Sequence, residues 1–378
     1  MIRRELVDEE RWISPARFNR TLAVYQVLPG PEAHELCVFF GLLVGGRPGG
    51  ILAGLGFMLP GFLLMLALSV FYVSVGLGSP IIAALFAGAQ VGVVALVARA
   101  VQHIGRRALK DGWLFALAGL AAGAELAGAH FAIVLACCGA AYVFARRRRV
   151  VAAMAVASLL AAVSLVFAFR APRWGQTPSG SDPMARALRW GQTPSGSDPM
   201  ASSKAQAPAV LASGLKAGLL TFGGAYTAIP FVRRDAVERE GWLTDRQFLD
   251  GLALGGVLPA PLIIFGTFVG YVAGGLAGAL AMTVGIFLPA FAITLVGHET
   301  LERVVQNRAL HDLLDGITAG VVGLIAATTV HLFRAGVDGF REVALFAIAL
   351  AVLYLWRSRA AVPVVVLASA AAGLLLWR

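Results

Sequence analysis

Two Pro-x-Pro sequences interrupt apolar stretches of this chain, one at Pro29–Gly30–Pro31 and one at Pro259–Ala260–Pro261. Proline lacks a backbone N–H and clashes with a continuing helix, so each sequence predicts a broken helix. A helix that begins after such a break offers free N–H groups and the positive end of its dipole, which favour an anion. A break inside a membrane is tolerated where it lines a cavity. The pair therefore predicts an anion-binding transport site, with two merely kinked, packed helices as the alternative.

Three cations in or beside an apolar stretch extend this prediction. Lys216 lies within the stretch 213–231, and Arg233 and Arg234 follow it. A guanidinium presents a rigid fork of donors that suits tetrahedral oxyanions. All three side chains are therefore expected to attract an oxyanion. The alternatives are that Lys216 extends to the membrane interface and that the arginines pair with nearby carboxylates such as Asp235.

Phe222, Gly223 and Gly224 lie in the same stretch and are predicted to line the approach to the site. Glycine lets a backbone come close to a ligand, but small residues serve plain helix packing equally well.

Three ionisable residues follow the first break: Glu32, His34 and Glu35. Ionisable groups inside a membrane are costly and usually functional, and histidine titrates near neutral pH. They are therefore candidates for coupling transport to a proton. A position at a wet interface is the alternative, because residues 262–264 are apolar at the matching place in the second half. They are also the only dense polar group in a predicted span, so a membrane enzyme acting on lipid would have its catalyst here.

The elements that must position these residues occur twice. Residues 3–31 resemble 233–261, residues 57–62 resemble 286–291, and residues 87–96 resemble 315–324. Identical residues link the first pair of segments, among them Arg3, Arg4, Trp12, Phe18, Leu22, Leu28, Pro29 and Pro31, which recur as Arg233, Arg234, Trp242, Phe248, Leu252, Leu258, Pro259 and Pro261. Internal repeats of membrane-length apolar segments are typical of secondary transporters.

Composition places the repeats in a membrane. The chain has 378 residues, 58% hydrophobic and only 14% charged, with a mean hydropathy of +0.79. Soluble proteins have about 25% charged residues. Apolar runs near 20 residues long predict an all-α, polytopic protein with 10 to 12 spans. The net charge of +10 is interpreted as basic cytoplasmic loops rather than nucleic-acid binding.

Three regions are predicted: a first repeat at 1–149, an extra span with a linker at 150–206, and a second repeat at 207–378. The linker contains the sequence RWGQTPSGSDPMA twice, at 173–185 and 189–201, and is interpreted as a flexible loop. Basic clusters at 106–110, 146–149 and 357–359 suit a cytoplasmic side. With one extra crossing at 150–169, the two halves are predicted to have inverted orientations.

Other classes of function find little support. The chain has three cysteines, at 37, 137 and 138, and no spacing typical of metal ligands, so neither a disulfide nor a metal is expected. No motif of hydrolases, metalloproteases or ATP-binding domains occurs. The protein is therefore predicted to be a carrier without a cofactor rather than an enzyme.

These segments together resemble the chromate ion transporter family. The resemblance rests on RRELVDEERWIS, VLPGPEAHELCVFFG, GFMLPGFLLMLAL, LTFGGAYTAIPFVRRDAVEREGWLT and LPAPLIIFGTFVGY, and covers most of the chain outside 150–206. It implies a multi-pass bacterial inner-membrane carrier that exports chromate and confers chromate resistance, with sulfate as the expected competitor. A sulfate or general oxyanion carrier remains the alternative, and a homodimer is a candidate assembly.

The chain departs from the family pattern at two places. The resemblance implies an apolar helix with an FGGP-type motif before each amphipathic segment. The second half has it as Phe222, Gly223, Gly224 and Ala225, with alanine where the family often has proline, and the first half lacks it. An upstream start, or a truncated copy that does not transport, is the expectation that follows.

Overall fold

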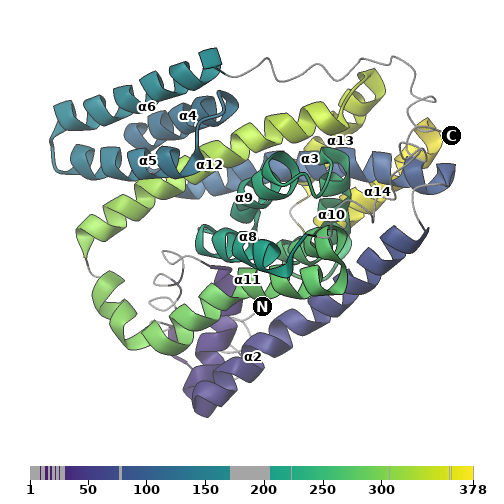
Figure 1. Cartoon of the computed structure of the whole chain (residues 1–378), viewed down its shortest axis with the longest axis horizontal. Coiled ribbons are helices and arrows are strands. Elements are labelled where there is room, and N and C mark those ends of the chain that lie inside the picture. Colours follow the sequence, from purple (N-terminus) through teal and green to yellow (C-terminus); the bar gives the residue numbers. More distant parts are fainter. Residues whose placement is uncertain are drawn as a thin grey trace.

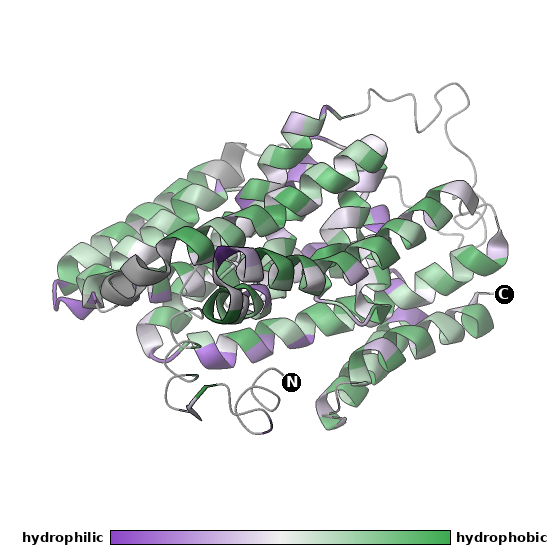
Figure 2. Cartoon of the chain, turned by 90° about the horizontal axis from the view of Figure 1, so that it is seen from below, coloured by the Kyte–Doolittle hydropathy of each residue, from purple (hydrophilic) through white to green (hydrophobic). Residues whose placement is uncertain are grey.

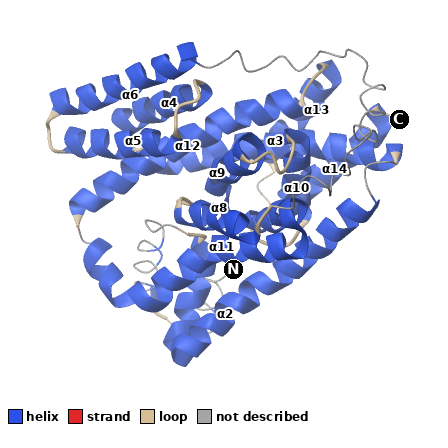
Figure 3. Cartoon of the chain, in the orientation of Figure 1, coloured by secondary structure: helices blue, strands red, loops and turns tan. Residues whose placement is uncertain are grey.

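A computed structural model describes residues 9, 13–15, 18, 22, 25, 30–75, 79–170, 205–222, 224–305, 307–356, 358 and 360–377. Within these ranges the secondary structure is helical, without a strand (Figure 3), which confirms the all-α prediction. Several residues of the sequence analysis lie outside the described ranges: Arg3, Arg4, Trp12, Pro29, Gly223, Arg357, Arg359 and the duplicated linker.

The helices of the first half are α2 (Glu32–Val75), α3 (Pro80–Ala108), α4 (Gly112–Leu126), α5 (Phe131–Arg146) and α6 (Val150–Arg170) (Figure 1). The second half starts with α8 (Ala207–Leu219) and the short turns η2 (Ala225–Ala228), α9 (Ile229–Arg233) and η3 (Arg234–Arg239). Then follow α10 (Asp245–Val257), η4 (Leu262–Ile264), α11 (Phe265–Val305), α12 (Arg308–Gly336), α13 (Phe340–Leu355) and α14 (Ala361–Leu376).

The two longest helices fold back on themselves at equivalent glycine pairs. In α2 the turn is Gly45–Gly46, and in α11 it is Gly274–Gly275; the second glycine of each pair has a φ of +60° and +64°. Glycine adopts this left-handed backbone without steric cost. In α2 the arms before and after the turn pack closely. A Cβ added to Gly41 of the first arm would lie only 2.6 Å from the Cβ of Ala53 of the second arm. The repeat seen in the sequence is therefore also a repeat of backbone geometry.

Equivalent helices of the two halves run antiparallel. Along α3 and α12, Gly105 lies beside Val322 whereas Gly336 lies beside Val94, so the residue numbers run in opposite directions. Along α2 and α11, Gly50 lies beside Leu295 and Gly54 beside Phe291 in the same reversed order. A pseudo-two-fold axis in the membrane plane reverses helix directions in this way. The predicted inversion of the two halves is confirmed.

The halves exchange their short helical hairpins. The hairpin of α4 and α5 packs on α12 of the second half, and the hairpin of α13 and α14 packs on α3 of the first (Figure 1). Small residues allow both contacts: a Cβ on Gly316 of α12 would lie 2.6 Å from the carbonyl oxygen of Cys138, and a Cβ on Gly92 of α3 would lie 2.9 Å from the Cβ of Ser369. Small residues are what helices in a membrane use to approach closely. Each half is therefore covered by part of the other.

Apolar residues predominate along most of the helices (Figure 2). Among the described residues, four helices are long and apolar enough to cross a membrane: Glu32–Ser74, Pro80–Ala108, Leu262–Gly297 and Ala309–Gly336. Five shorter apolar helices of 10–17 residues accompany them, including α4, α5 and α14. The protein is a multi-pass membrane protein, while the number of 10 to 12 spans stays a prediction.

One helix breaks the symmetry. Helix α8 packs on α11, where a Cβ on Gly285 would lie 2.7 Å from the carbonyl oxygen of Leu211. The equivalent residue of the first half, Gly56 on α2, is exposed, and no described atom lies within 4 Å of an added Cβ. No described helix of the first half covers α2 as α8 covers α11.

The reciprocal packing predicts that Gly316→Val destabilises the fold. The valine would collide with backbone of α5, and overpacking of this kind costs about 1–3 kcal/mol of unfolding free energy. Gly119→Val is the matched control, because an added Cβ at Gly119 meets nothing within 4 Å. Thermal unfolding of the purified protein in detergent checks this: a midpoint as high for Gly316→Val as for Gly119→Val contradicts it.

Candidate functional site

Both helices are interrupted where the sequence predicts. Helix α10 ends at Val257, Leu258 is extended (φ −70°, ψ 142°), and helical structure resumes at η4 after Pro261. In the first half Gly30 has a φ of +149°, and α2 begins at Glu32, directly after Pro31. The described residues of the two breaks thus place a helix start just after each proline.

The breaks are joined through the segment between α8 and η2. The Gly30 N–H donates a hydrogen bond to the carbonyl oxygen of Thr221, at 2.8 Å. Phe222 follows and is buried, and Gly224 has a φ of +129°, a backbone conformation that favours glycine. On the other side, η2 packs against η4, which follows the second break. The described residues at both breaks and in this segment therefore lie in one region.

The ionisable residues after the first break are deeply placed. His34 and Glu35 are both 0% exposed, which argues against the wet interface. The His34 ring packs edge-on against the rings of Phe287 and Phe291, with centroids 4.9 and 4.6 Å away. Within the described residues, neither carboxylate oxygen of Glu35 has a hydrogen-bond partner. A buried polar group without a partner is uncommon and calls for a functional or solvent explanation, so the prediction of proton coupling at Glu32, His34 and Glu35 stays open.

Lys216 and Arg234 are held in one polar cluster between the halves. Lys216 forms an ion pair with Asp235 of η3, and its ammonium lies 5.1 Å from the ring centre of Phe131. Arg234 lies 3.4 Å from a carboxylate oxygen of Glu125 and donates to the carbonyl oxygen of Ala129 at 3.1 Å. Its guanidinium also approaches the Phe131 ring, at 5.6 Å. These two cations thus bind α8 and η3 to the α4–α5 hairpin.

Arg233 is also occupied by carboxylates. Its side chain is 7% exposed and donates to Glu238 at 2.5 Å and to Asp245 at 2.8 Å. The alternative of ion pairing, left open by the sequence, is therefore what the geometry shows for Lys216, Arg233 and Arg234. A direct role for them in oxyanion binding stays a prediction, and it requires an anion to compete with these carboxylates.

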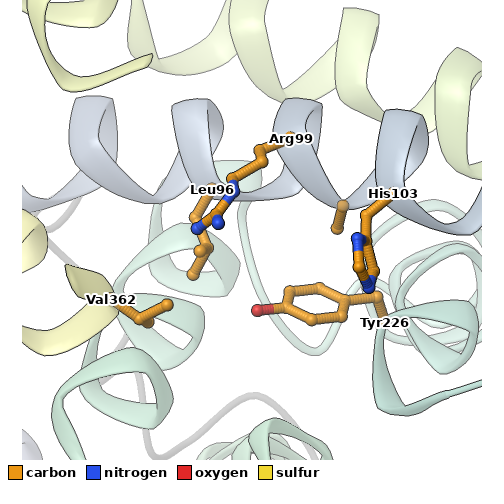
Figure 4. A pocket seen from close by; sticks show the side chains of 6 residues that line it. Leu96, Arg99, His103, Tyr226 and Val362 are labelled. Atoms are coloured by element: carbon orange, nitrogen blue, oxygen red, sulfur yellow. The ribbon is translucent and has the colours of Figure 1, made fainter. Parts of the chain in front are cut away.

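A cavity of about 200 Å³ lies between the two halves, beside the C-terminal part of α3. Arg99 and His103 line it from successive turns of α3, Tyr226 from η2, and Val362 from α14, with Leu96 and Ala100 completing the wall. In Figure 4 the Tyr226 hydroxyl points toward the side of the cavity where Arg99, Leu96 and Val362 lie, while the His103 ring lies at the opposite end of the tyrosine ring. Among the described residues, no carboxylate lies within ion-pair distance of Arg99. A guanidinium, a phenol and an imidazole at one cavity can together donate hydrogen bonds to an oxyanion.

Arg99, His103 and Tyr226 were not among the residues predicted from the sequence. Arg99 and His103 carried a usable signal, since they are polar residues four apart near the end of an otherwise apolar helix and so lie on one face. Tyr226 comes two residues after Gly224 and had no signal of its own. Its place depends on the turn that follows α8, which local sequence does not specify.

Fold and site together define a helical membrane carrier with two inverted repeats and a cationic cavity between them. A sequence model of the chromate transporter family matches residues 1–174 and 209–374. The chain belongs to the chromate transporter family, and the resemblance found in the sequence is confirmed.

Comparison with known proteins also supports membership of this family. The chain is 51% identical to a chromate transport protein of Pseudomonas aeruginosa, over 100% of this chain and 87% of that protein. It is 27% identical to a chromate transport protein of Cupriavidus metallidurans, over 99% of this chain and 86% of that one. A probable chromate transport protein of Synechococcus elongatus is 25% identical, over 99% and 89%. No solved structure matches the chain.

The ion pair at Lys216 leads to a testable prediction. Lys216→Ala leaves Asp235, whose side chain is only 7% exposed, without its cation, and a buried unpaired charge is strongly destabilising. The double variant Lys216→Ala/Asp235→Ala removes both charges and is expected to recover most of the folded yield and transport lost in the single variant. Yield by size-exclusion chromatography and chromate accumulation in cells measure both. A double variant that folds well but transports no better than the single one contradicts it and assigns Lys216 to the anion.

Proposed function

We propose that this protein is a secondary transporter that exports chromate across the bacterial inner membrane and so confers chromate resistance. The observation that carries the proposal is the cavity at Arg99, where a cation faces a space between two inverted repeats without a carboxylate partner among the described residues. Membership of the family and the printed names of the relatives support chromate as the substrate.

The cavity suits a tetrahedral dianion. Arg99 supplies fixed N–H donors and a permanent positive charge. Tyr226 supplies a hydroxyl group, and His103 supplies an imidazole N–H. Leu96 and Val362 bring apolar surface to the same space, which lowers the local dielectric and strengthens the attraction of the charges. Lys216, Arg233 and Arg234 are already held by carboxylates, whereas Arg99 lines the cavity without such a partner among the described residues.

The inverted fold offers a route from binding to transport. Arg99 and His103 belong to the first half, and Tyr226 and Val362 to the second. Movement of one half against the other therefore changes which side of the membrane the cavity faces, as in other inverted-repeat carriers. An inside-negative potential drives a dianion outward by about 4–5 kcal/mol per 100 mV, from about 2.3 kcal/mol per charge.

We further propose that the chain transports its substrate unchanged and is not an enzyme acting on lipid. Membership of a transporter family supports this. Such an enzyme would need Glu32, His34 and Glu35 as its catalyst. We propose that these three residues instead belong to the transport pathway.

Arg99→Ala is expected to abolish chromate export. Loss of a charged hydrogen-bond donor costs about 1.5–3 kcal/mol, which lowers chromate affinity by about 10- to 150-fold. The measurement is chromate accumulation in a sensitive bacterium: wild type below the vector control, Arg99→Ala at the vector level. Arg106→Ala, an exposed arginine on the last turn of the same helix, is the matched control and should export normally. Equal accumulation in Arg99→Ala and wild type contradicts the assignment of the cavity, and equal accumulation in wild type and vector contradicts export.

The second candidate function is a general oxyanion carrier, because sulfate has the shape and charge of chromate and Arg99 cannot distinguish the two by charge. Chromate uptake into everted vesicles, with sulfate added in increasing amounts, separates the functions. A chromate carrier is expected to need sulfate in large excess, at least tenfold, for half inhibition. Half inhibition at equimolar sulfate decides for the general carrier.

A further inference from the structure

A second polar centre lies away from the cavity, in the middle of α10. Asp250 is 0% exposed. The Tyr72 hydroxyl donates a hydrogen bond to its Oδ2 at 2.8 Å, and the Gln90 side-chain amide donates to its Oδ1 at 2.7 Å. Tyr72 belongs to α2 and Gln90 to α3, so this one carboxylate connects α10 to both helices. Both donors are neutral, and among the described residues no cation forms an ion pair with Asp250.

The surroundings of Asp250 supply little compensating charge. Arg246, one turn earlier on α10, acts on Asp250 electrostatically but donates to Asp338 at 3.1 Å. From the other helices packed on α10, the neighbours are apolar or uncharged: Phe268 of α11 beside Gly251, Val366 of α14 beside Gly256, and Gly336 of α12 beside Leu249. Arg246 and Asp338, together with Tyr72, are the charged or titratable groups that the described residues bring to this centre.

We propose that Asp250 is a proton-binding site, occupied in one stage of the transport cycle and empty in another, which couples proton movement to oxyanion movement. The proposal rests on the transport function proposed above and goes beyond it. The physical reason is that an ionised carboxylate in a membrane interior is costly without a cation. Binding a proton from water removes that charge, and releasing the proton restores it.

Proton binding must change the contacts between helices. The ionised carboxylate accepts from both Tyr72 and Gln90. The protonated carboxyl carries an O–H on one oxygen, and that oxygen becomes a weaker acceptor, so the hydrogen bond it receives from Tyr72 or Gln90 weakens or reverses its direction. Gln90 can do so by rotating its amide, and Tyr72 through its hydroxyl oxygen. The proton therefore decides how tightly α10 is held to α2 and α3.

These helices lead directly to the transport site. Helix α10 runs into the break at Leu258–Pro261. Gln90 and Arg99 are nine residues apart on α3, about 13–14 Å along the helix axis. One rigid helix thus carries a contact to the proton site and a contact to the anion cavity, so a change at Asp250 can reach both the cavity and the break.

A proton fits this centre better than a metal cation. Asp250 is the one carboxylate at this centre among the described residues, and its two partners are neutral groups that meet it with an O–H and an N–H, whereas a metal cation needs several oxygen or nitrogen ligands. The centre also differs from Glu35, whose oxygens have no described partner. At Asp250 the partners lie on two other helices, so the proton has a direct structural effect.

Asp250→Asn tests the inference in the full-length protein reconstituted into liposomes. Asparagine keeps the size and can bond Tyr72 and Gln90, yet its side chain does not titrate. Two signals are recorded: counterflow of labelled chromate at equal pH, and the change of a trapped pH-sensitive dye during net chromate transport. Wild type should show both. Asp250→Asn should keep counterflow within about twofold and lose the dye signal at least tenfold. Asp315→Asn, an exposed carboxylate 3.3 Å from Lys110, is the control and should retain both.

The other outcomes overturn the inference. A dye signal preserved in Asp250→Asn shows that another group carries the proton. Loss of counterflow together with the dye signal, in protein with wild-type thermal stability, assigns Asp250 to helix packing. A wild type that moves chromate without protons, or with sodium in their place, overturns the coupling but leaves the transport function intact. A wild type without counterflow fails at the proposed function itself.

A second variant keeps the test decisive should Asp250→Asn not fold. Gln90→Glu places another carboxylate beside Asp250, and a neighbouring like charge favours the protonated form. The pH dependence of net chromate transport should then move by about one unit or more to higher pH. An unchanged pH profile in folded Gln90→Glu protein overturns the inference.

Discussion

The antiparallel contact of α3 with α12 is the constraint on which the rest of the structure depends. Gly105 meets Val322 at one end, and Gly336 meets Val94 at the other, so each helix lies against its own repeat counterpart. Because the α4–α5 hairpin covers α12 and the α13–α14 hairpin covers α3, neither half completes its own packing. Small residues at positions such as Gly316 make these contacts possible, and van der Waals contact at short range is what holds helices together in lipid. The two repeats form one unit for this reason.

The same exchange creates the site. A cavity lined by Arg99 of α3 and Val362 of α14 exists only because the second half's hairpin reaches the first half's helix. The polar cluster at Lys216 has the mirrored origin, since Phe131 and Glu125 reach η3 from the first half's hairpin. Charged residues at the boundary between halves are thus divided into two kinds. Lys216 and Arg234 have carboxylate partners and contact Phe131 and Glu125 of the other half's hairpin, while Arg99 faces the cavity.

Sequence alone predicted the class of fold, the repeat, the inversion and the interruption of both helices, because proline, glycine and apolar run length act locally. It could not predict the exchange of hairpins, because a hairpin that packs on its own half and one that packs on the other have the same apolar pattern. The sequence could not predict the ion-pair partners of Lys216 and Arg233 either, because a cation near a carboxylate in the sequence can pair with it or remain free. Arg99 was not predicted because the cavity beside it is closed by Tyr226 and Val362, which lie more than 120 positions away in the sequence.

Differences between the repeats indicate where transport chemistry resides. Continuing the alignment of 87–96 with 315–324 places Ala327 opposite Arg99, while His331 matches His103. A strict two-fold axis would build two equal cavities, but the arginine occurs in one repeat alone. In the same way, Asp250 corresponds to Arg20, and His34 and Glu35 correspond to Ile264 and Phe265. Packing residues such as the glycine pairs are kept in both halves because both must fold, whereas ionisable residues are unequal because one anion pathway needs one set of charges. An inverted repeat supplies two interchangeable backbones, and the asymmetric side chains determine which of the equivalent positions binds the anion and which the proton.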